Sequence, residues 1–144
     1  ETVAASQTPA EATAALYGSI CEPTGNRATV FIASVCKNAG CIDSRAAFGI
    51  FWGPSSRRNT GQRISGKQND GRAILTGILY TLLYADLTQQ LDIHTTSKYA
   101  IRSICYWAGT NYTEGWNCAN ADLIQVIACS IQRRQSRISF LWVE

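Results

Sequence analysis

Short apolar runs of strand length fill the first half of the chain, and apolar residues at helical spacing fill much of the second half. From Arg27 onward, three runs rich in β-branched and aromatic residues are separated by Gly, Asn and Pro. They read ATVFIASV at 28–35, RAAFGIFWG at 45–53 and TGQRISG at 60–66. Three consecutive short strands predict an antiparallel meander.

The second half of the chain is predicted to be mostly helical. Periodicity indicates helices over 72–87, 97–109 and 121–137 and short strands over 91–96 and 138–144. A strand reached through a helix is expected to lie parallel to an earlier strand, by the right-handed crossover rule. The order of elements therefore predicts a mixed α/β sheet.

One domain accounts for most of the chain. Residues 1–26 are small and polar, contain Pro9 and Pro23, and are predicted to form an N-terminal extension with at most a short helix from Pro9 to Leu16. Residues 27–144 are predicted to form the folded domain. A length of 144 residues with 46% hydrophobic and 16% charged residues is sufficient for one hydrophobic core.

The charge balance does not by itself identify a partner. The chain contains thirteen Lys and Arg residues and ten Asp and Glu residues. The resulting net charge of +3 is too small to establish a nucleic-acid partner. No apolar run approaches the roughly 20 residues that span a bilayer, so no membrane partner is expected. Arg57 and Arg58 are expected at a solvated hairpin tip. Arg133, Arg134 and Arg137 are expected to end the third helix, where cations complement the helix dipole.

The cysteines leave two interpretations open. Six cysteines without a CxxC motif, and one His, make a structural zinc site of ordinary ligand spacing unfavourable. Their even number suggests disulfides, and Cys36 with Cys41, or Cys105 with Cys118, would each close a small loop. Buried free thiols are the alternative.

The beginning of the chain bears on localisation. The sequence contains no Met and opens with a polar, Ala-rich and Thr-rich segment, as expected if a secretory signal has been removed. We therefore expect an extracellular protein, and the sequon that begins at Asn111 is compatible with this. A trimmed cytosolic protein with reduced cysteines is the alternative.

Several motifs then indicate a family. The order of elements, together with FGIFWGP at 48–54, NTGQRISGKQNDGRA at 59–73, TTS at 95–97 and two Trp motifs at Trp107 and Trp116, resembles the type 1 ribonuclease H domain. This family cuts RNA in RNA:DNA hybrids. The resemblance covers Thr29 to Val143. It implies an RNase H-like α/β fold with a five-stranded mixed sheet of order 3-2-1-4-5, flanking helices and no C-terminal helix.

The resemblance also implies where catalytic groups belong. Two Mg²⁺ ions in the family need carboxylates clustered at one end of the sheet. Three of those positions hold Ala33, Ile74 and Thr96 here, and the segment with the fourth lies beyond the last strand. From this we predict no metal, no cofactor and no enzymatic activity, a pseudo-ribonuclease H. A hydrolase with relocated ligands, such as Asp70 and Asp92, is the alternative.

Nucleic-acid contacts of the family map onto other positions. The resemblance implies a phosphate pocket at Lys67, Asn69 and Asn120, and aromatic channel positions at Trp107 and Trp116, whose alternative role is packing. The excursion between the second and third helices contains no Lys or Arg. Phosphate neutralisation supplies most nonspecific affinity, so weak nucleic-acid binding is expected at physiological salt.

Three functional hypotheses follow. The first is a catalytically inactive, secreted, effector-like binding module that acts on a protein or an RNA. The second is an intracellular pseudoenzyme that binds nucleic acid as a scaffold. The third is the hydrolase with relocated metal ligands.

Overall fold

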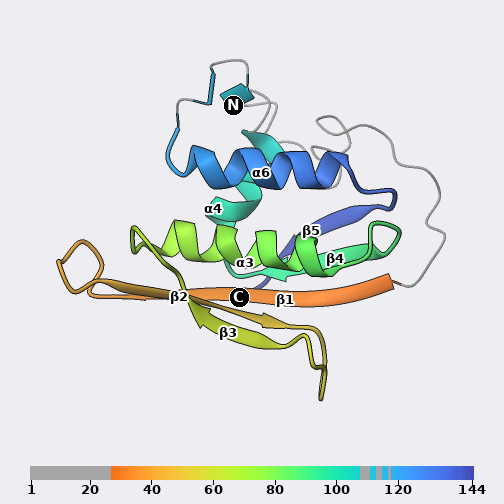
Figure 1. The fold of residues 1–144 in the computed structure, drawn as a ribbon, viewed down its shortest axis with the longest axis horizontal. Coiled ribbons are helices and arrows are strands. Elements are labelled where there is room, and N and C mark those ends of the chain that lie inside the picture. The colour runs from red at the N-terminus through yellow and green to blue at the C-terminus, as the bar shows by residue number, and fades with distance from the viewer. Residues whose placement is uncertain (1–26, 108–110, 113–114, 117) are drawn as a thin grey trace.

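A computed structural model describes residues 27–107, 111–112, 115–116 and 118–144. The strands are β1 (Arg27–Lys37), β2 (Arg45–Phe51), β3 (Thr60–Arg63), β4 (Gln90–Thr95) and β5 (Ile138–Trp142). The helices are α3 (Asp70–Tyr84), α4 (Lys98–Ile101), the π-helix η1 (Arg102–Tyr106) and α6 (Ala121–Gln132) (Figure 1). The short helix expected from Pro9 to Leu16 lies outside the described residues.

The sheet has the predicted topology. Its order is β3-β2-β1-β4-β5, with β1, β2 and β3 antiparallel to one another in turn. Strand β4 runs parallel to β1, and β5 runs parallel to β4. The mixed five-stranded sheet with flanking helices confirms the predicted α/β, RNase H-like architecture.

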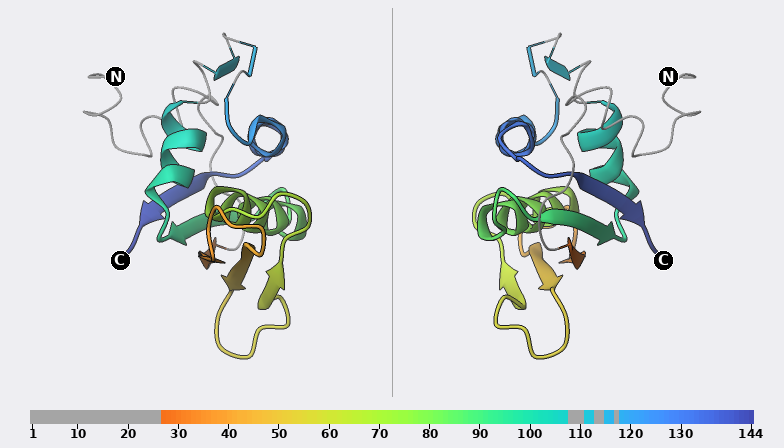
Figure 2. Two further views of the ribbon diagram at one scale, coloured as in Figure 1. Left: turned by 90° about the vertical axis from the view of Figure 1, so that its left-hand side faces the viewer. Right: turned by 90° about the vertical axis from the view of Figure 1, so that its right-hand side faces the viewer.

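The sheet buries one face against helices. Along β1, Val30 and Ile32 are buried while Phe31 and Ala33 are exposed, as the period of two along a strand requires. Figure 2 shows α3 and α6 on one side of the sheet, with α6 packed beyond α3. At Gly77 helix α3 approaches the sheet so closely that an added Cβ would lie 2.9 Å from Cγ2 of Ile32.

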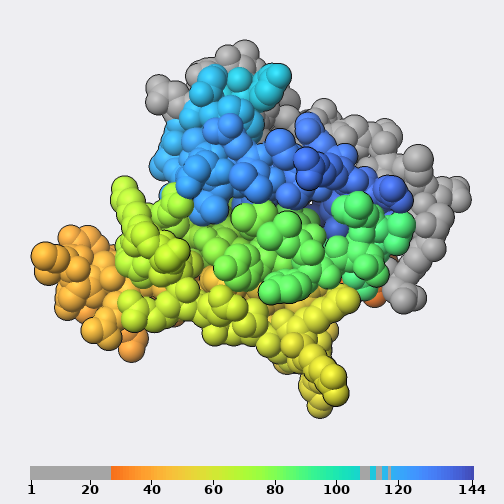
Figure 3. All heavy atoms as spheres, viewed as in Figure 1, coloured from red at the N-terminus to blue at the C-terminus, as the bar shows by residue number. Residues whose placement is uncertain are grey.

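The β2–β3 hairpin projects from the body of the molecule (Figure 3). Its tip holds Arg57 and Arg58, both exposed as expected from the sequence. The guanidinium of Arg58 lies over the ring of Trp52, 5.1 Å from the ring centre. The contact holds one of the two cations against the protein's own surface.

Helix α6 ends five residues before the predicted end. It stops at Gln132, and Arg134 is buried rather than placed on the last helical turn. The Arg134 side chain donates hydrogen bonds to the main-chain carbonyls of Asp86 and Gln89. Burial lowers the pKa of this guanidinium. The prediction that Arg134 complements the helix dipole is therefore wrong. The side chain instead connects the loop before β5, in which Arg134 lies, to the loop before β4 through these hydrogen bonds.

The second predicted helix is shorter and irregular. Ser97 caps α4 by accepting a hydrogen bond from the backbone N–H of Ala100. After Ile101 the chain widens into a π-helix, and the N–H of Trp107 donates to the carbonyl of Arg102 at 2.8 Å. A π-helical turn changes the direction of the side chains that follow it. The Trp107 side chain therefore points in a different direction than it would after a continuous α-helix.

The cysteine pairs considered from sequence are not bridged. Cys36, Cys41 and Cys118 are free thiols, so neither small loop is closed by a disulfide. Burial raises the pKa of the Cys118 thiol. Within the described part of the chain, no helix has the length and apolar character needed to cross a membrane.

Candidate nucleic-acid interface

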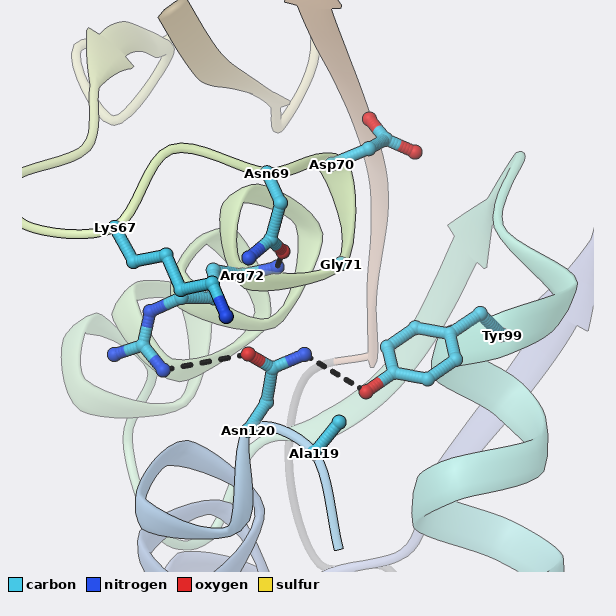
Figure 4. A pocket seen from close by; sticks show the side chains of 8 residues that line it. All are labelled: Lys67, Asn69, Asp70, Gly71, Arg72, Tyr99, Ala119 and Asn120. Atoms are coloured by element: carbon cyan, nitrogen blue, oxygen red, sulfur yellow. Dashed lines mark hydrogen bonds between the residues drawn. The ribbon is translucent and has the colours of Figure 1, made fainter. Parts of the chain in front are cut away.

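A cavity of about 430 Å³ lies where the start of α3 meets α4 and the residues just before α6 (Figure 4). Its lining comes from three segments that are far apart in sequence: Lys67, Asn69, Asp70, Gly71, Arg72, Tyr99, Ala119 and Asn120. The structure thus brings Lys67, Asn69 and Asn120, the three phosphate-pocket positions implied by the resemblance, to a single cavity. Their role in binding stays a prediction.

Asn69 forms the N-cap of α3. Its backbone is extended, and its Oδ1 accepts a hydrogen bond of 2.8 Å from the N–H of Arg72. Because Oδ1 is used in this way, the side-chain NH₂ group is the part of the amide that can donate to a ligand. The first turn of a helix also carries a partial positive charge, which favours anions.

Asn120 is held in place from both ends of its amide. Its backbone adopts the left-handed conformation, with φ of 59°. The Nδ2 group donates to the hydroxyl of Tyr99 at 2.9 Å, and Oδ1 accepts from Arg72 at 3.3 Å (Figure 4). Tyr99 and Arg72 therefore fix the orientation of the Asn120 side chain at the cavity wall.

Arg72 and Lys67 differ in their electrostatic situation. Arg72 forms a two-pronged ion pair with Asp122, with N–O distances of 3.0 and 2.8 Å. The pair raises the pKa of Arg72 and lowers the pKa of Asp122 to about 2. Lys67 is exposed and forms no ion pair with any described residue. Among the cations that line the cavity, Lys67 is thus the one without an ion-pair partner in the described part of the chain.

Gly71 sets how closely α3 approaches α4. A Cβ at this position would lie 2.9 Å from Cε2 of Tyr99 and 3.1 Å from Nδ2 of Asn120. Any larger residue would displace the Tyr99 ring, which the hydrogen bond to Asn120 holds in place. Glycine is needed here for close contact between helices.

A second hollow of about 380 Å³ adjoins the first and shares Tyr99 and Ala119 with it. Trp107 lines this hollow with 41% of its surface exposed. Trp116 is partly buried against the core, and its ring meets that of Tyr112 edge to face at 6.2 Å. The geometry leaves Trp107 accessible to a ligand and gives Trp116 a packing role.

The three positions where the family places carboxylates are spread over different environments. Ala33 is exposed on the open face of β1 and Thr96 is exposed just after β4, whereas Ile74 lies on α3 and is fully buried. Close to Ala33, the hydroxyl of Ser34 donates to a carboxylate oxygen of Asp70 at 2.7 Å. Asp70 also lines the cavity, and Figure 4 shows its side chain pointing away from Lys67.

Asp70 and Asp92, the two candidates for relocated ligands, are not brought together. Asp92 is buried and bound by Arg27, at the opposite end of β1 from Asp70. Among the described residues, no group of three or more His, Cys, Asp or Glu side chains is arranged to hold a metal ion.

Curated relatives match the chain in part. Ribonuclease H1 of Mus musculus is 29% identical over 94 residues, and Ribonuclease H1 of Homo sapiens is 30% identical over 95 residues. Each match covers 64% of this chain, and the chain spans 31% of the length of these relatives. No protein-family model matches the sequence. The matches support a distant, RNase H-like relationship.

These relatives contradict one prediction. Both carry the name of an enzyme, so the prediction that this chain is not an enzyme is wrong on this evidence. That prediction considered the side chains at three aligned positions and the segment with the fourth carboxylate, which lies beyond the last strand. Such a count does not measure which oxygen atoms the folded chain supplies, as the Asp70 carboxylate beside Ser34 illustrates.

Sequence reasoning missed three residues that shape the cavity: Gly71, Tyr99 and Asp122. Gly71 was visible as a glycine in the first turn of a helix, a costly position that points to close packing. Tyr99 and Asp122 gave no such signal, because their contacts join segments 21 and 50 residues apart.

Proposed function

We propose that this chain binds nucleic acid through the sugar–phosphate backbone, with one phosphate held in the cavity at the start of α3. The observation that carries the proposal is the convergence of Lys67, Asn69 and Asn120 on that cavity. The distant relationship to proteins named Ribonuclease H1 is consistent with it.

The chemistry of the cavity suits a phosphate. Lys67 supplies a point charge on a flexible stem, the amide of Asn69 supplies a neutral donor, and the first turn of α3 supplies a partial positive charge. Arg72 is occupied by Asp122 and acts as a positioning residue for Asn120. One phosphate contact on a duplex gives a modest salt dependence, with a slope of about 0.9 in log affinity against log salt.

The neighbouring hollow extends the same surface. A backbone that leaves a phosphate in the cavity would pass Tyr99 and reach Trp107. The exposed indole offers a flat apolar surface to a sugar or a base. Because the names of the relatives indicate action on RNA, we propose an RNA-containing duplex as the ligand of this surface.

We further propose that the protein acts as an extracellular binding module, which the sequon at Asn111 supports. Mass spectrometry of the protein from its natural source tests this part. A glycan on Asn111 supports secretion, whereas an unmodified Asn111 on every recovered molecule counts against it.

An electrophoretic shift with an RNA:DNA hybrid, duplex RNA and single-stranded RNA tests the proposal, at about 0.15 M salt, where exposed charges are already screened. The expected result is a shift of at least one duplex, and Lys67→Gln should weaken this shift. Arg133→Gln removes the same charge from an exposed residue outside the cavity and should leave the shift unchanged. Failure of both duplexes to shift, or equal losses in the two variants, would overturn the proposal.

A further inference from the structure

The face of the sheet opposite α3 carries a row of rings. In the strand register, Phe31 on β1 is the direct partner of Phe51 on β2 and of His94 on β4, and His94 is the partner of Leu141 on β5. Side chains at paired positions share one face of a sheet. The three rings therefore cross β2, β1 and β4, and Leu141 continues the row on β5.

Three of these four side chains are exposed to solvent, and His94 is partly buried. Phe31, Phe51 and Leu141 expose 44%, 45% and 42% of their surface. The ring centre of Phe31 lies 4.7 Å from that of His94, with 33° between the planes, and 6.4 Å from that of Phe51. Exposed large apolar side chains gathered in one place mark a binding surface more often than scattered ones do.

The neighbouring part of the face is flat. Two residues along β1 and β2 from the ring row, Ala33 pairs with Gly49, and Gly49 pairs with Gly61 on β3. A Cβ added to Gly49 would meet no atom within 4 Å, so space above this position is open. A hollow of about 450 Å³ lies here, between Phe31, Phe51 and the small residues.

Cations occupy the far end of the same face. Lys37 pairs with Arg45, and Arg63 pairs with Ala47, which places all three exposed cations on the side of Phe31 and Phe51. At roughly 3.3 Å per residue, they lie roughly 13 to 20 Å along the strands from the ring row. None of the three forms an ion pair with a described residue.

Acidic groups on this face are few. Asp92 points to the same side but is bound by Arg27, and Glu144 lines the hollow beside the rings. The face thus combines rings at one end, a flat floor and cations at the other end. Its charge is complementary to an anionic chain that also carries flat rings.

We propose that this open sheet face is a second binding surface, which takes single-stranded nucleic acid by stacking unpaired bases on Phe31, Phe51 and His94 while Lys37, Arg45 and Arg63 neutralise phosphates. Stacking on aromatic side chains with a basic track beside them is how sheet surfaces bind single strands. The surface is separate from the phosphate cavity, and the inference does not rest on the proposed function.

Fluorescence anisotropy of labelled strands of about 12 nucleotides, a length within the usual site size, tests the inference with the full chain. The probes are RNA, DNA of the same sequence, and a DNA strand with abasic sites, which keeps the phosphates and lacks the rings. We expect the normal strands to bind at least about tenfold more tightly than the abasic strand, because the loss of one stack alone weakens binding by about that factor. Equal binding of the abasic strand, or no binding of any strand, overturns the inference.

Variants distinguish base stacking from nonspecific hydrophobic binding. Phe31→Leu keeps an apolar side chain but removes the ring, and should weaken binding about tenfold. Phe31→Tyr should restore it. Leu83→Ala, a matched change at an exposed apolar residue of α3, should leave it unchanged. Arg63→Gln should lower the slope of affinity against salt by about 0.7, the value for one phosphate contact on a single strand. Unchanged binding in Phe31→Leu contradicts the inference.

Two further outcomes distinguish this surface from its alternatives. Lys67→Gln should leave single-strand binding intact, and a shared loss of duplex and single-strand binding would show one surface and overturn the inference. The second outcome is a protein that elutes as a dimer, becomes a monomer in Phe51→Glu and binds no single strand. This result would show that a second copy of the chain covers the face, and it would also overturn the inference.

Discussion

Arg72 and Asp122, fifty residues apart in sequence, form a two-pronged ion pair that joins the start of α3 to the start of α6. Asn120 lies beside this pair and accepts a hydrogen bond from the same guanidinium. The pair thus serves the cavity in two ways. It fixes one wall, and it neutralises a cation that would otherwise face an incoming anion.

Removing the charge of Asp122 is expected to have opposite effects on stability and on binding. Asp122→Asn should lower the free energy of unfolding by less than about 1 kcal/mol, because the Asp122 side chain is 65% exposed and solvent screens the pair. The same variant should bind duplex nucleic acid more tightly, since Arg72 then adds a second uncompensated cation. Urea denaturation and anisotropy measure the two effects, and weaker binding in Asp122→Asn would contradict this account.

The pair also predicts how stability depends on acid. The pKa of Asp122 is lowered to about 2, below the value of about 3.9 expected in the unfolded chain. A lowered pKa contributes stability that is complete above about pH 4 and is lost as pH falls toward 2. The difference in urea midpoint between the natural protein and Asp122→Asn should therefore be constant from pH 7 to about 5 and shrink below about pH 4. A difference that grows in acid would exclude this role.

Gly71 offers a test of the cavity's geometry. Gly71→Ala places a Cβ against the Tyr99 ring, and such overpacking costs about 1–3 kcal/mol, offset in part by the better helix propensity of Ala. We expect a net loss of about 1 kcal/mol and weaker duplex binding. In a Tyr99→Leu background the clash is removed, so Gly71→Ala should become neutral or stabilising. Equal losses in both backgrounds would show that Tyr99 is not what Gly71 accommodates.

Much of the fold was predictable because its signals are local. The alternation along β1 and the helical spacing after Arg72 follow from which side chains face the core, and both predictions hold. The end of α6 was not predictable, because Arg134 leaves the helix to reach carbonyls in a loop 45 to 48 residues away. Charge on a helical turn looks the same in sequence whether the side chain is solvated or buried.

Some residues of the candidate site were likewise predictable from local sequence, and others were not. Lys67 and Asn69 are close in sequence and precede a helix, so their proximity was predictable. Asn120 was predicted only from the resemblance to the ribonuclease H family. The roles of Tyr99 and Asp122 depend on contacts across the fold, which no local pattern records.

Gly77 provides a test of how α3 packs on the sheet. An added Cβ would lie 2.9 Å from Cγ2 of Ile32 and 3.2 Å from two atoms of Phe48, all in the core. Gly77→Ala should lower the free energy of unfolding by about 1–3 kcal/mol despite its better helix propensity. Gly49→Ala is the matched control, since its Cβ would enter open space. Thermal denaturation compares them, and equal stability of the two variants would contradict the close approach of α3.

The salt dependence of duplex binding tests the central claim most directly. If Lys67 contacts a phosphate, Lys67→Gln should weaken binding and reduce the slope of log affinity against log salt by about 0.9, the value for one duplex phosphate contact. Arg133→Gln should change neither quantity. A slope in Lys67→Gln equal to that of the natural protein would show that the cavity at the start of α3 does not hold a phosphate.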